Sequence, residues 1–185
     1  MVDVIHTQRL VLRPLEASDA DRLHALFNNW VVIRRLSSPP WPYTLEDARG
    51  FVSRQAKNAH DPTNACVAIT RDDVLIGGID IRVSSSEPRR PGPILGYWLG
   101  EDYWGEGYMT EAAQGFLAHV FAAGIGDVVC SGAYANNAAS LRVQEKLGFT
   151  HEAERMMFAK PRGGEFPHID TTLTQSRFES LSASR

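Results

Sequence analysis

Alternating or short apolar runs recur along the chain and predict strands. The first run, residues 9–13, alternates polar and apolar side chains until Pro14 ends it. Another run contains Gly77-Gly78, and glycines inside a strand indicate a bulge or the close approach of another backbone. The predicted strands cover residues 9–13, 65–70, 74–83, 95–99, 128–133, 149–158 and 169–178.

Apolar residues three and four positions apart predict four helices between these strands. Ser18 opens the first, with Asp21 three residues on, close to a capping box. Thr44 and Asp47 cap the second in the same way, and three prolines make the intervening residues 31–43 a shaped loop. The helices are marked by Leu23, Leu26, Phe27 and Trp30; by Ala48, Phe51, Val52, Gln55 and Ala56; by Met109, Ala112, Ala113, Phe116, Leu117, Val120 and Phe121; and by residues 137–147, ended by Gly148.

In chain order these elements are β-α-α-β-β-β-α-β-α-β-β, which is typical of a mixed sheet with helices on its faces. We therefore assign the α/β class, in its mixed α+β form. The length of 185 residues favours one domain over residues 1–185. The polar stretch 84–93, rich in serine, proline and arginine, is predicted to be a hairpin connection.

Charge and composition exclude several function classes. The formal net charge is −3 with 22% charged residues, so no overall field favours nucleic acid or an acidic membrane. The first residues show no basic segment followed by an apolar one, so we expect no signal peptide. No apolar run is long enough to span a bilayer. Cys66 and Cys130 each lie in an apolar stretch, which favours free thiols over a disulfide or a metal site, and we expect a cytoplasmic protein without a metal.

Residues 95–113 combine a predicted strand, a turn with Gly105 and Gly107, and the start of a helix. A helix that begins after such a turn presents unpaired backbone N–H groups and the positive end of its dipole. Phosphate and pyrophosphate groups bind at places of this kind. Turns with two glycines are common, so the rest of the chain decides what this one does.

Two motifs at compatible spacing are more specific than either alone. Tyr-Trp-Gly-Glu-Gly-Tyr-Met-Thr-Glu-Ala begins at Tyr103, and about thirty residues on, Asn137-Ala-Ala-Ser140 precedes Glu-Lys-Leu-Gly-Phe. With the opening residues 7–14 and Pro42-Tyr43-Thr44, these motifs resemble the acyl-CoA-binding core of the GNAT N-acetyltransferases. They are most similar to the ribosomal-protein N-terminal acetyltransferase branch, the RimJ/RimL type. The resemblance covers nearly the whole chain.

The resemblance implies the GNAT fold, a mostly antiparallel central sheet that is splayed between its middle strands and binds acetyl-CoA. The pantetheine arm would lie between residues 95–99 and 128–133 and pair with the first strand, in the manner of an added strand. Backbone N–H groups of the turn would hold the pyrophosphate, and glycines allow close approach. The family's usual small residue at the end of this turn is Met109 here. The implied coenzyme-binding residues are Tyr97, Trp98, Leu99, Trp104, Gly105, Glu106, Gly107, Tyr108, Met109, Thr110, Asn137 and Ser140.

Asn137 and Ser140 have two interpretations. Both residue types belong in the first turn of a helix, where they cap it. By resemblance, Asn137 hydrogen-bonds the pantetheine arm and Ser140 lies near the thioester sulfur, and the roles can coexist. Many family members place a tyrosine seven residues after the asparagine as the acid for the departing thiolate, but that position is Gln144 here. Glutamine cannot usefully donate a proton at neutral pH, so Ser140 is the candidate acid, directly or through water.

The base and the acceptor site are marked less clearly. The nucleophile must be a neutral amine, and an α-amino group loses its proton more readily than a lysine side chain. Candidate bases are Glu101, Asp102 and Asp80, of which Asp80 is also a candidate acceptor contact. Each could equally be a solvated carboxylate, and a water chain to bulk solvent is a further alternative. The resemblance puts the first two helices beside the acceptor, so Trp30, Trp41 and Tyr43 could line its site or pack in the core.

These residues predict an acetyl-CoA-dependent N-acetyltransferase in which an amine attacks the thioester directly in a ternary complex. Substrate choice lies in loops, so the acceptor is either a protein N-terminal α-amine, which the branch favours, or a small amine or antibiotic. A non-catalytic acyl-CoA-binding module is kept open by Gln144 and Met109. A different phosphate-ligand protein built on the glycine turn is least favoured. The family also suggests a homodimer through the C-terminal strands.

Overall fold

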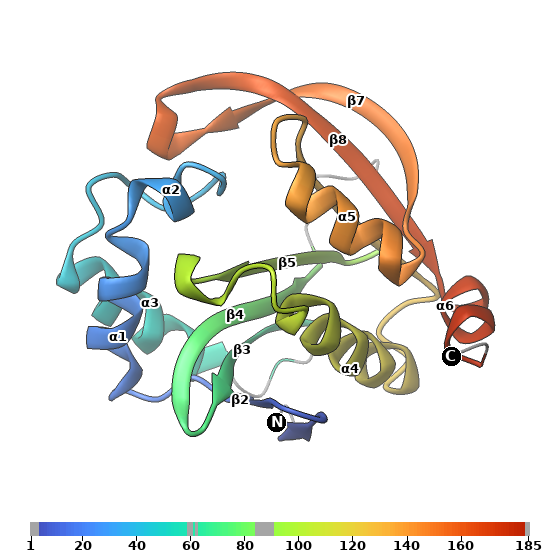
Figure 1. The fold of residues 1–185 in the computed structure, drawn as a ribbon, viewed down its shortest axis with the longest axis horizontal. Helices are drawn as coiled ribbons and strands as arrows, with labels where there is room; N and C mark the ends of the chain where they lie inside the picture. Colours follow the sequence, from blue (N-terminus) through green and yellow to red (C-terminus); the bar gives the residue numbers. More distant parts are fainter. Residues whose placement is uncertain (1–3, 59–60, 62, 84–90, 184–185) are drawn as a thin grey trace.

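The computed structural model describes residues 4–58, 61, 63–83 and 91–183. It centres on an eight-stranded mixed sheet in the order β1-β2-β3-β4-β5-β6-β8-β7, with helices on both faces (Figure 1). The strands are β1 (Ile5–His6), β2 (Val11–Pro14), β3 (Asn64–Arg71), β4 (Val74–Arg82), β5 (Ile94–Leu99), β6 (Val128–Tyr134), β7 (Thr150–Ala159) and β8 (Gly164–Thr174). The helices are α1 (Asp19–Phe27), α2 (Trp30–Ile33), α3 (Leu45–Asn58), α4 (Tyr108–Ala122), α5 (Ala138–Leu147) and α6 (Gln175–Ser182), with short 3-10 helices at Glu101–Tyr103 and Lys160–Arg162. The predicted α/β class is confirmed.

The sheet is antiparallel except at its middle. Strands β1 to β5 pair antiparallel with their neighbours, and so do β6 with β8 and β8 with β7. Strands β5 and β6 run parallel, and within the described residues their register holds one pair, Ile94 with Cys130. The two strands therefore part directly after this contact, which confirms the predicted splay.

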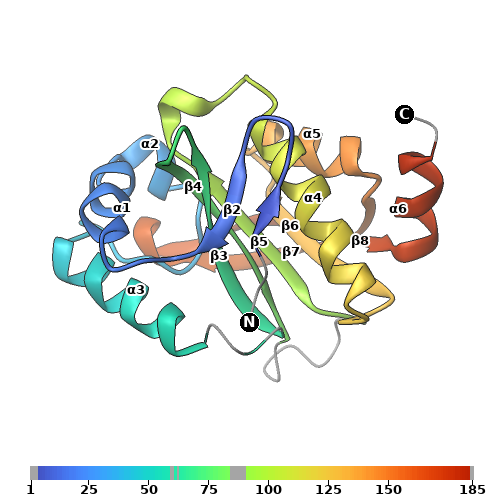
Figure 2. The same cartoon turned by 90° about the horizontal axis from the view of Figure 1, so that it is seen from below.

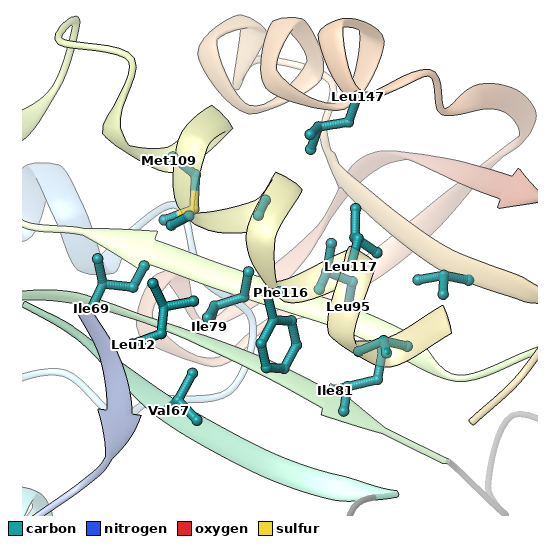
Figure 3. Close-up of a cluster of buried hydrophobic side chains, with 14 of the residues drawn as sticks. Leu12, Val67, Ile69, Ile79, Ile81, Leu95, Met109, Phe116, Leu117 and Leu147 are labelled. Carbon is teal, nitrogen blue, oxygen red and sulfur yellow. The ribbon is translucent and has the colours of Figure 1, made fainter. Parts of the chain in front are cut away.

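Helices cover both faces of the sheet, so β3 and β4 are buried on both sides. Val67 and Ile69 join the hydrophobic cluster under α4, whereas Ala68 joins the cluster under α1 and α3, because successive side chains of a strand alternate in direction. Figure 2 shows α1 and α3 on one side of the sheet and α4 on the other. In Figure 3, Phe116 of α4 lies among strand residues that include Ile79. The two clusters hold β4 and β5 in place around the site described below.

The glycine pair of β4 lies against the neighbouring strand. A Cβ at Gly77 would come 2.4 Å from the Trp98 carbonyl oxygen, and one at Gly78 would come 2.8 Å from the indole nitrogen of Trp98. The register between β3 and β4 shifts between Ile69 and Thr70, beside Gly77. The predicted bulge and the predicted close backbone approach are therefore both present.

The last strand was predicted wrongly at both ends. Strand β8 begins at Gly164 instead of residue 169 and ends at Thr174, and the next 8 residues form α6. The Thr174 hydroxyl caps this helix by accepting a hydrogen bond from the Arg177 backbone N–H. Phe178 then packs against Phe121 of α4, with ring centroids 5.4 Å apart. The cap and the contact with a distant aromatic ring both stabilise this helix. Neither produces the spacing of apolar residues on which the sequence prediction relied.

Two details near the N-terminus also differ from the prediction. Helix α1 ends before Trp30, which instead starts α2, because the Asn29 side chain caps that helix by accepting a backbone hydrogen bond at 2.8 Å. Part of the predicted loop 31–43 is therefore helical. The Ser18 side chain makes no cap hydrogen bond. The Asp19 carboxylate instead accepts the Glu16 backbone N–H, which lies before the helix, at 2.8 Å.

The other predicted caps are confirmed. The Thr44 backbone N–H donates to the Asp47 carboxylate at 2.9 Å, and the Asp47 N–H donates back to the Thr44 hydroxyl at 3.1 Å. Asn137 caps α5, and Gly148 ends it in the left-handed conformation with φ 97°. Both boundaries of α5 are therefore set by residues within or next to it.

Three smaller predictions concern thiols, a connection and membrane spans. Cys66 on β3 and Cys130 on β6 form no disulfide with each other, as predicted. Residues 84–90 of the predicted hairpin connection lie outside the described residues. Among the residues that the structure describes, no helix is both long and apolar enough to cross a membrane.

Candidate active site

A cavity of about 1130 Å³ opens where β5 and β6 part. Its walls come from β4, β5, β6, the turn before α4, one side of α5, the segment between α2 and α3, and α3 itself. The Ser131 hydroxyl donates to the Leu95 carbonyl at 3.0 Å and bridges the two strands near their contact. Beyond this bridge, residues 96–99 line the cavity while pairing with β4 on their other side. One edge of β5 therefore offers its backbone to a ligand as far as Trp98, whereas the Leu99 carbonyl accepts the Trp104 indole N–H at 3.0 Å.

The glycine turn adopts the backbone conformation that an anion site requires. Gly105 has φ 83° and Gly107, the N-cap of α4, has φ 80°. This left-handed region is costly for residues that carry a Cβ. A Cβ at Gly105 would meet nothing within 4 Å, so the conformation, not the space, demands glycine. The turn leads into the first N–H groups of a 15-residue helix, which have no partner within the helix.

Met109 packs in the core and leaves the turn accessible. Its side chain is only 7% exposed and belongs to the cluster that contains Ile69 and Phe116 (Figure 3). The larger residue at this position therefore does not obstruct the backbone N–H groups of the turn. Of the predicted turn residues, those that line the cavity are Trp104, Gly105, Gly107, Tyr108, Met109 and Thr110.

Arg9 and Glu111 brace the turn from the outside. Glu111, in the first turn of α4, accepts hydrogen bonds from the Thr7 hydroxyl, the Arg9 N–H and the Arg9 guanidinium, each at 2.7 Å. Arg9 also donates to the Glu106 carbonyl at 3.1 Å and lies over the Tyr108 ring at 4.5 Å. Burial raises the pKa of Glu111, but the hydrogen bonds from Thr7 and Arg9 outweigh it, so the pKa lies below its ordinary value.

Glu111→Gln should destabilise the protein at neutral pH and weaken the dependence of stability on acid pH. Because the folded-state pKa is lowered, the contribution of this carboxylate is fully present above its ordinary pKa of 4.5 and is lost as pH falls through the folded value. We expect the free energy of unfolding to fall by about 1–2 kcal/mol at neutral pH and by less in acid. Urea unfolding across this range measures the difference, with the exposed Glu154→Gln as control. Identical pH profiles for wild type and Glu111→Gln would contradict the brace.

The side chains of Tyr97 and Gln144 meet the Ser140 hydroxyl. The Tyr97 hydroxyl lies 2.9 Å from the Ser140 hydroxyl, and the Gln144 amide donates to the Tyr97 oxygen at 3.2 Å. Gln144 is 1% exposed, and its carbonyl oxygen accepts from the Thr171 hydroxyl at 2.8 Å. The Tyr97 hydroxyl can donate to the Ser140 hydroxyl or to the Ser140 carbonyl, which is 3.2 Å away, so either hydroxyl can be the donor in the bond between the two. Burial raises the pKa of Tyr97, and hydrogen bonds with Ser140 and Gln144 oppose that rise.

The sequence indicated Ser140 and Gln144 but missed the Tyr97 side chain. Tyr97 was expected to contribute only its backbone. Its hydroxyl instead reaches from β5 to α5 and lies beside Gln144, the position at which many GNAT enzymes carry a tyrosine. One signal was available, because alternation places Tyr97 on the face of β5 that carries Leu95 and Leu99, and a buried tyrosine hydroxyl needs a partner.

Asn137 faces two elements at once. Its side-chain oxygen accepts from the Ser140 backbone N–H at 3.4 Å, as a cap, and from the Arg35 guanidinium at 3.0 Å. Arg35 comes from the segment between α2 and α3, 102 residues away in the chain. No local pattern in the sequence points to this contact.

Comparison with known proteins places the chain in a family. Residues 9–150 match the family model described as an acetyltransferase (GNAT) domain. The chain belongs to the GNAT acetyltransferase family. The N-acetyltransferase YnaD of Bacillus subtilis (strain 168) is 30% identical over 165 residues, which are 88% of this chain and 91% of that protein.

Two solved acetyltransferase structures share the fold. RimL, a ribosomal L7/L12 alpha-N-protein acetyltransferase in complex with coenzyme A, superposes with a TM-score of 0.79 at 22% identity, covering 93% of this chain and 98% of that one. The microcin C7 self-immunity acetyltransferase MccE, in complex with acetyl-CoA and AMP, gives a TM-score of 0.78 at 16% identity, covering 90% and 93%. At these identities the similarity concerns the fold.

In this GNAT acetyltransferase, Asp80 and Tyr43 line the cavity together with Ser140. Asp80 pairs with the Arg82 guanidinium at 2.8 Å; burial raises the pKa of its carboxyl, and Arg82 opposes that rise. A Cβ at Gly96 would come 2.5 Å from an Asp80 carboxylate oxygen, so glycine on β5 makes room for this side chain. Burial, with the charge of Asp47, raises the pKa of Tyr43 to about 12. Tyr43 therefore stays protonated and can donate a hydrogen bond.

Glu101 and Trp30 are not among the described residues that line the GNAT cavity. The Glu101 carboxylate accepts from the Asn29 amide at 2.7 Å and ties the segment after β5 to α2. Trp30 is 40% exposed, and its ring centroid lies 5.3 Å from that of Trp41. In this structure both residues stabilise the α2 segment.

Proposed function

We propose that this protein is an acetyl-CoA-dependent N-acetyltransferase whose acceptor is the α-amine at a protein N-terminus. One observation carries the proposal: a single cavity holds both the open edge of β5 and the hydroxyl pair of Ser140 and Tyr97. A thioester bound along that edge would bring its sulfur to the hydroxyl pair. The fold shared with RimL, an alpha-N-protein acetyltransferase, supports the choice of an N-terminal α-amine.

The residues present fit acetyl-CoA. The backbone N–H groups of residues 105–109 lie at the start of α4, where the helix dipole favours a pyrophosphate, whereas the Trp104 N–H donates to the Glu101 carbonyl. The open backbone of residues 96–98 suits the amide groups of the pantetheine arm, as in strand addition. The cavity of about 1130 Å³ slightly exceeds the ~300–1,000 Å³ typical of ligand pockets, which leaves room for an acceptor beside the arm. When bound, acetyl-CoA supplies an activated acetyl group.

Ser140 is the proposed proton donor. The amine nitrogen bonds to the thioester carbonyl carbon, the carbon–sulfur bond breaks, and the departing sulfur takes up a proton. The Ser140 hydroxyl can give that proton while receiving one from Tyr97, 2.9 Å away. The nitrogen gives its proton to a base, and solvent water returns a proton to the hydroxyl pair. Backbone N–H groups along β5 stabilise the negative charge that develops on the carbonyl oxygen.

Asp80 is the proposed acceptor contact and base. Its carboxyl lies in the cavity wall, and the pKa raised by burial makes it a stronger base than a solvated carboxylate. Tyr43 can donate a hydrogen bond to the acceptor from the same cavity. An α-amine suits this site better than a lysine, because a larger fraction of it is neutral near pH 7.

Release of the free CoA thiol tests the proposal. The protein and acetyl-CoA are mixed with a lysine-free peptide whose α-amine is free, or with the same peptide carrying a blocked N-terminus and one lysine. We expect thiol release with the first peptide only, and mass spectrometry should place the acetyl group on its α-nitrogen. Turnover on the lysine peptide alone would overturn the assignment of the acceptor.

Two other functions share this site. A small-molecule acceptor is supported by the fold shared with MccE, which binds acetyl-CoA and AMP, and it predicts turnover with small primary amines but not with peptides. A non-catalytic acyl-CoA-binding module predicts tight binding of acetyl-CoA by calorimetry and no thiol release with any amine. The same assay therefore separates all three functions.

A further inference from the structure

Arg35 reaches across the cavity from the segment after α2 to the start of α5. Its Nε donates to the Val31 carbonyl at 3.1 Å, which holds the side chain against its own helical turn. Its Nη1 donates to the Asn137 side-chain oxygen at 3.0 Å, and its guanidinium lies 4.7 Å from the centroid of the Trp104 ring. Arg35, Asn137 and Trp104 all line the cavity. One side chain thus joins α2, the start of α5 and the turn before α4.

The contact with Arg35 bears on which end of the Asn137 amide group, the oxygen or the NH₂, faces the guanidinium. A guanidinium has only donors, so the group that faces Arg35 must be the Asn137 oxygen. The other partner of that oxygen, the Ser140 N–H, is 3.4 Å away, against 3.0 Å for Arg35. The shorter, charge-assisted bond from Arg35 is therefore the stronger constraint. With the oxygen engaged, the NH₂ group of Asn137 is left to donate to a ligand.

We propose that Arg35 is a positioning residue for the coenzyme, which holds the Asn137 oxygen so that the Asn137 NH₂ group donates to an amide carbonyl of the pantetheine arm. The inference rests on the proposed function, since it takes acetyl-CoA as the ligand. Without Arg35 only the longer bond from the Ser140 N–H still holds the Asn137 oxygen, so the amide is held less firmly in the orientation that donates to a carbonyl. Arg35 then acts through Asn137.

The segment that carries Arg35 is itself anchored. At its start the Asn29 amide donates to the Glu101 carboxylate at 2.7 Å, and at its end the Ser37 carbonyl accepts from the Lys160 N–H at 2.9 Å. Figure 1 shows the tip of the β7–β8 hairpin arching towards α2, where the second of these bonds forms. Because both ends are held, the guanidinium approaches Asn137 from a defined direction.

An arginine suits this place better than a lysine. The planar guanidinium stacks on Trp104 while it donates to Val31 and Asn137 together, which a single ammonium group cannot do. Burial, together with the nearby Arg34, lowers the pKa of Arg35, and Glu101 opposes that change. A guanidinium nevertheless stays charged at neutral pH, since its ordinary pKa is far above that range.

Calorimetric titration with CoA and with 3′-phosphoadenosine 5′-diphosphate, which lacks pantetheine, tests the proposal. Arg35→Ala should weaken CoA binding about threefold to tenfold, the value of one hydrogen bond, and should leave binding of the shorter ligand unchanged. Arg35→Lys should fall between wild type and Arg35→Ala. The neighbouring Arg34→Ala, at an exposed position, is the matched control and should bind both ligands as wild type does.

A double-mutant cycle with Asn137→Ser shows whether Arg35 acts through Asn137. Serine keeps a capping oxygen for α5 and removes the amide. If the proposal holds, adding Arg35→Ala to Asn137→Ser weakens CoA binding no further. Additive losses would overturn the proposal by assigning Arg35 a direct contact, and so would unchanged CoA binding in Arg35→Ala, or equal weakening of both ligands. Failure of the wild type to bind CoA would instead reject the proposed function.

Discussion

Ser140→Ala is expected to lower kcat by about 100-fold or more, because a positioned acid contributes a factor of this order when the leaving group departs as an anion. The affinity for CoA should change by less than about threefold, since the cap bond at Ser140 comes from its backbone N–H. Thiol release under saturating acetyl-CoA measures kcat, and calorimetry measures the affinity. The exposed Ser53→Ala on α3 is the matched control.

Tyr97→Phe should reproduce part of this loss. It removes the hydroxyl that lies 2.9 Å from the Ser140 hydroxyl but leaves the ring in the core. Water can replace the missing group behind Ser140, so we expect kcat to fall less than in Ser140→Ala. Normal turnover by Ser140→Ala would remove the acid assignment without removing acetyl transfer itself. If the two hydroxyls act in series, the double variant with Ser140→Ala and Tyr97→Phe should be no slower than Ser140→Ala alone.

Phe116→Ala is expected to reduce the free energy of unfolding by about 3–5 kcal/mol. Phe116 is 1% exposed and lies between α4 and the sheet, among Leu12, Ile79 and Leu117 (Figure 3). Removing the ring loses the free energy gained by burying it. It also leaves a cavity that the close-packed neighbours fill only in part. Urea unfolding, followed by far-UV circular dichroism, measures the change.

Phe158→Ala is the control, because it removes a side chain of the same size from an exposed position. Phe158 is 55% exposed on β7, so its truncation should cost less than about 1 kcal/mol. Similar losses for Phe116→Ala and Phe158→Ala would show that α4 is not the main support of the core. Helix α4 begins at the glycine turn, so CoA binding requires α4 to be folded. Phe116→Ala should therefore weaken CoA binding only at urea concentrations near its lowered unfolding midpoint.

Much of this fold follows from signals that lie within a few residues. The capping box of Thr44 and Asp47, the cap at Asn137 and the glycine stop at Gly148 each act over one helical turn, and each was predicted. The glycine turn before α4 was predicted for the same reason, because a left-handed φ is a property of single residues. The resemblance to GNAT enzymes added the splay between the middle strands, which no local period contains.

Tertiary packing decided the rest. Helix α6 has a local cap at Thr174, but its apolar residue Phe178 packs against the distant Phe121, and a short apolar run alone is equally consistent with a strand. The Tyr97 hydroxyl reaches Ser140 across 43 residues, and Arg35 reaches Asn137 across 102. Such contacts depend on where whole elements pack, so spacing along the chain carries no trace of them. The sequence by itself therefore determined the elements, the glycine turn and the candidates Asn137 and Ser140, whereas only the tertiary structure decided which distant side chains orient them.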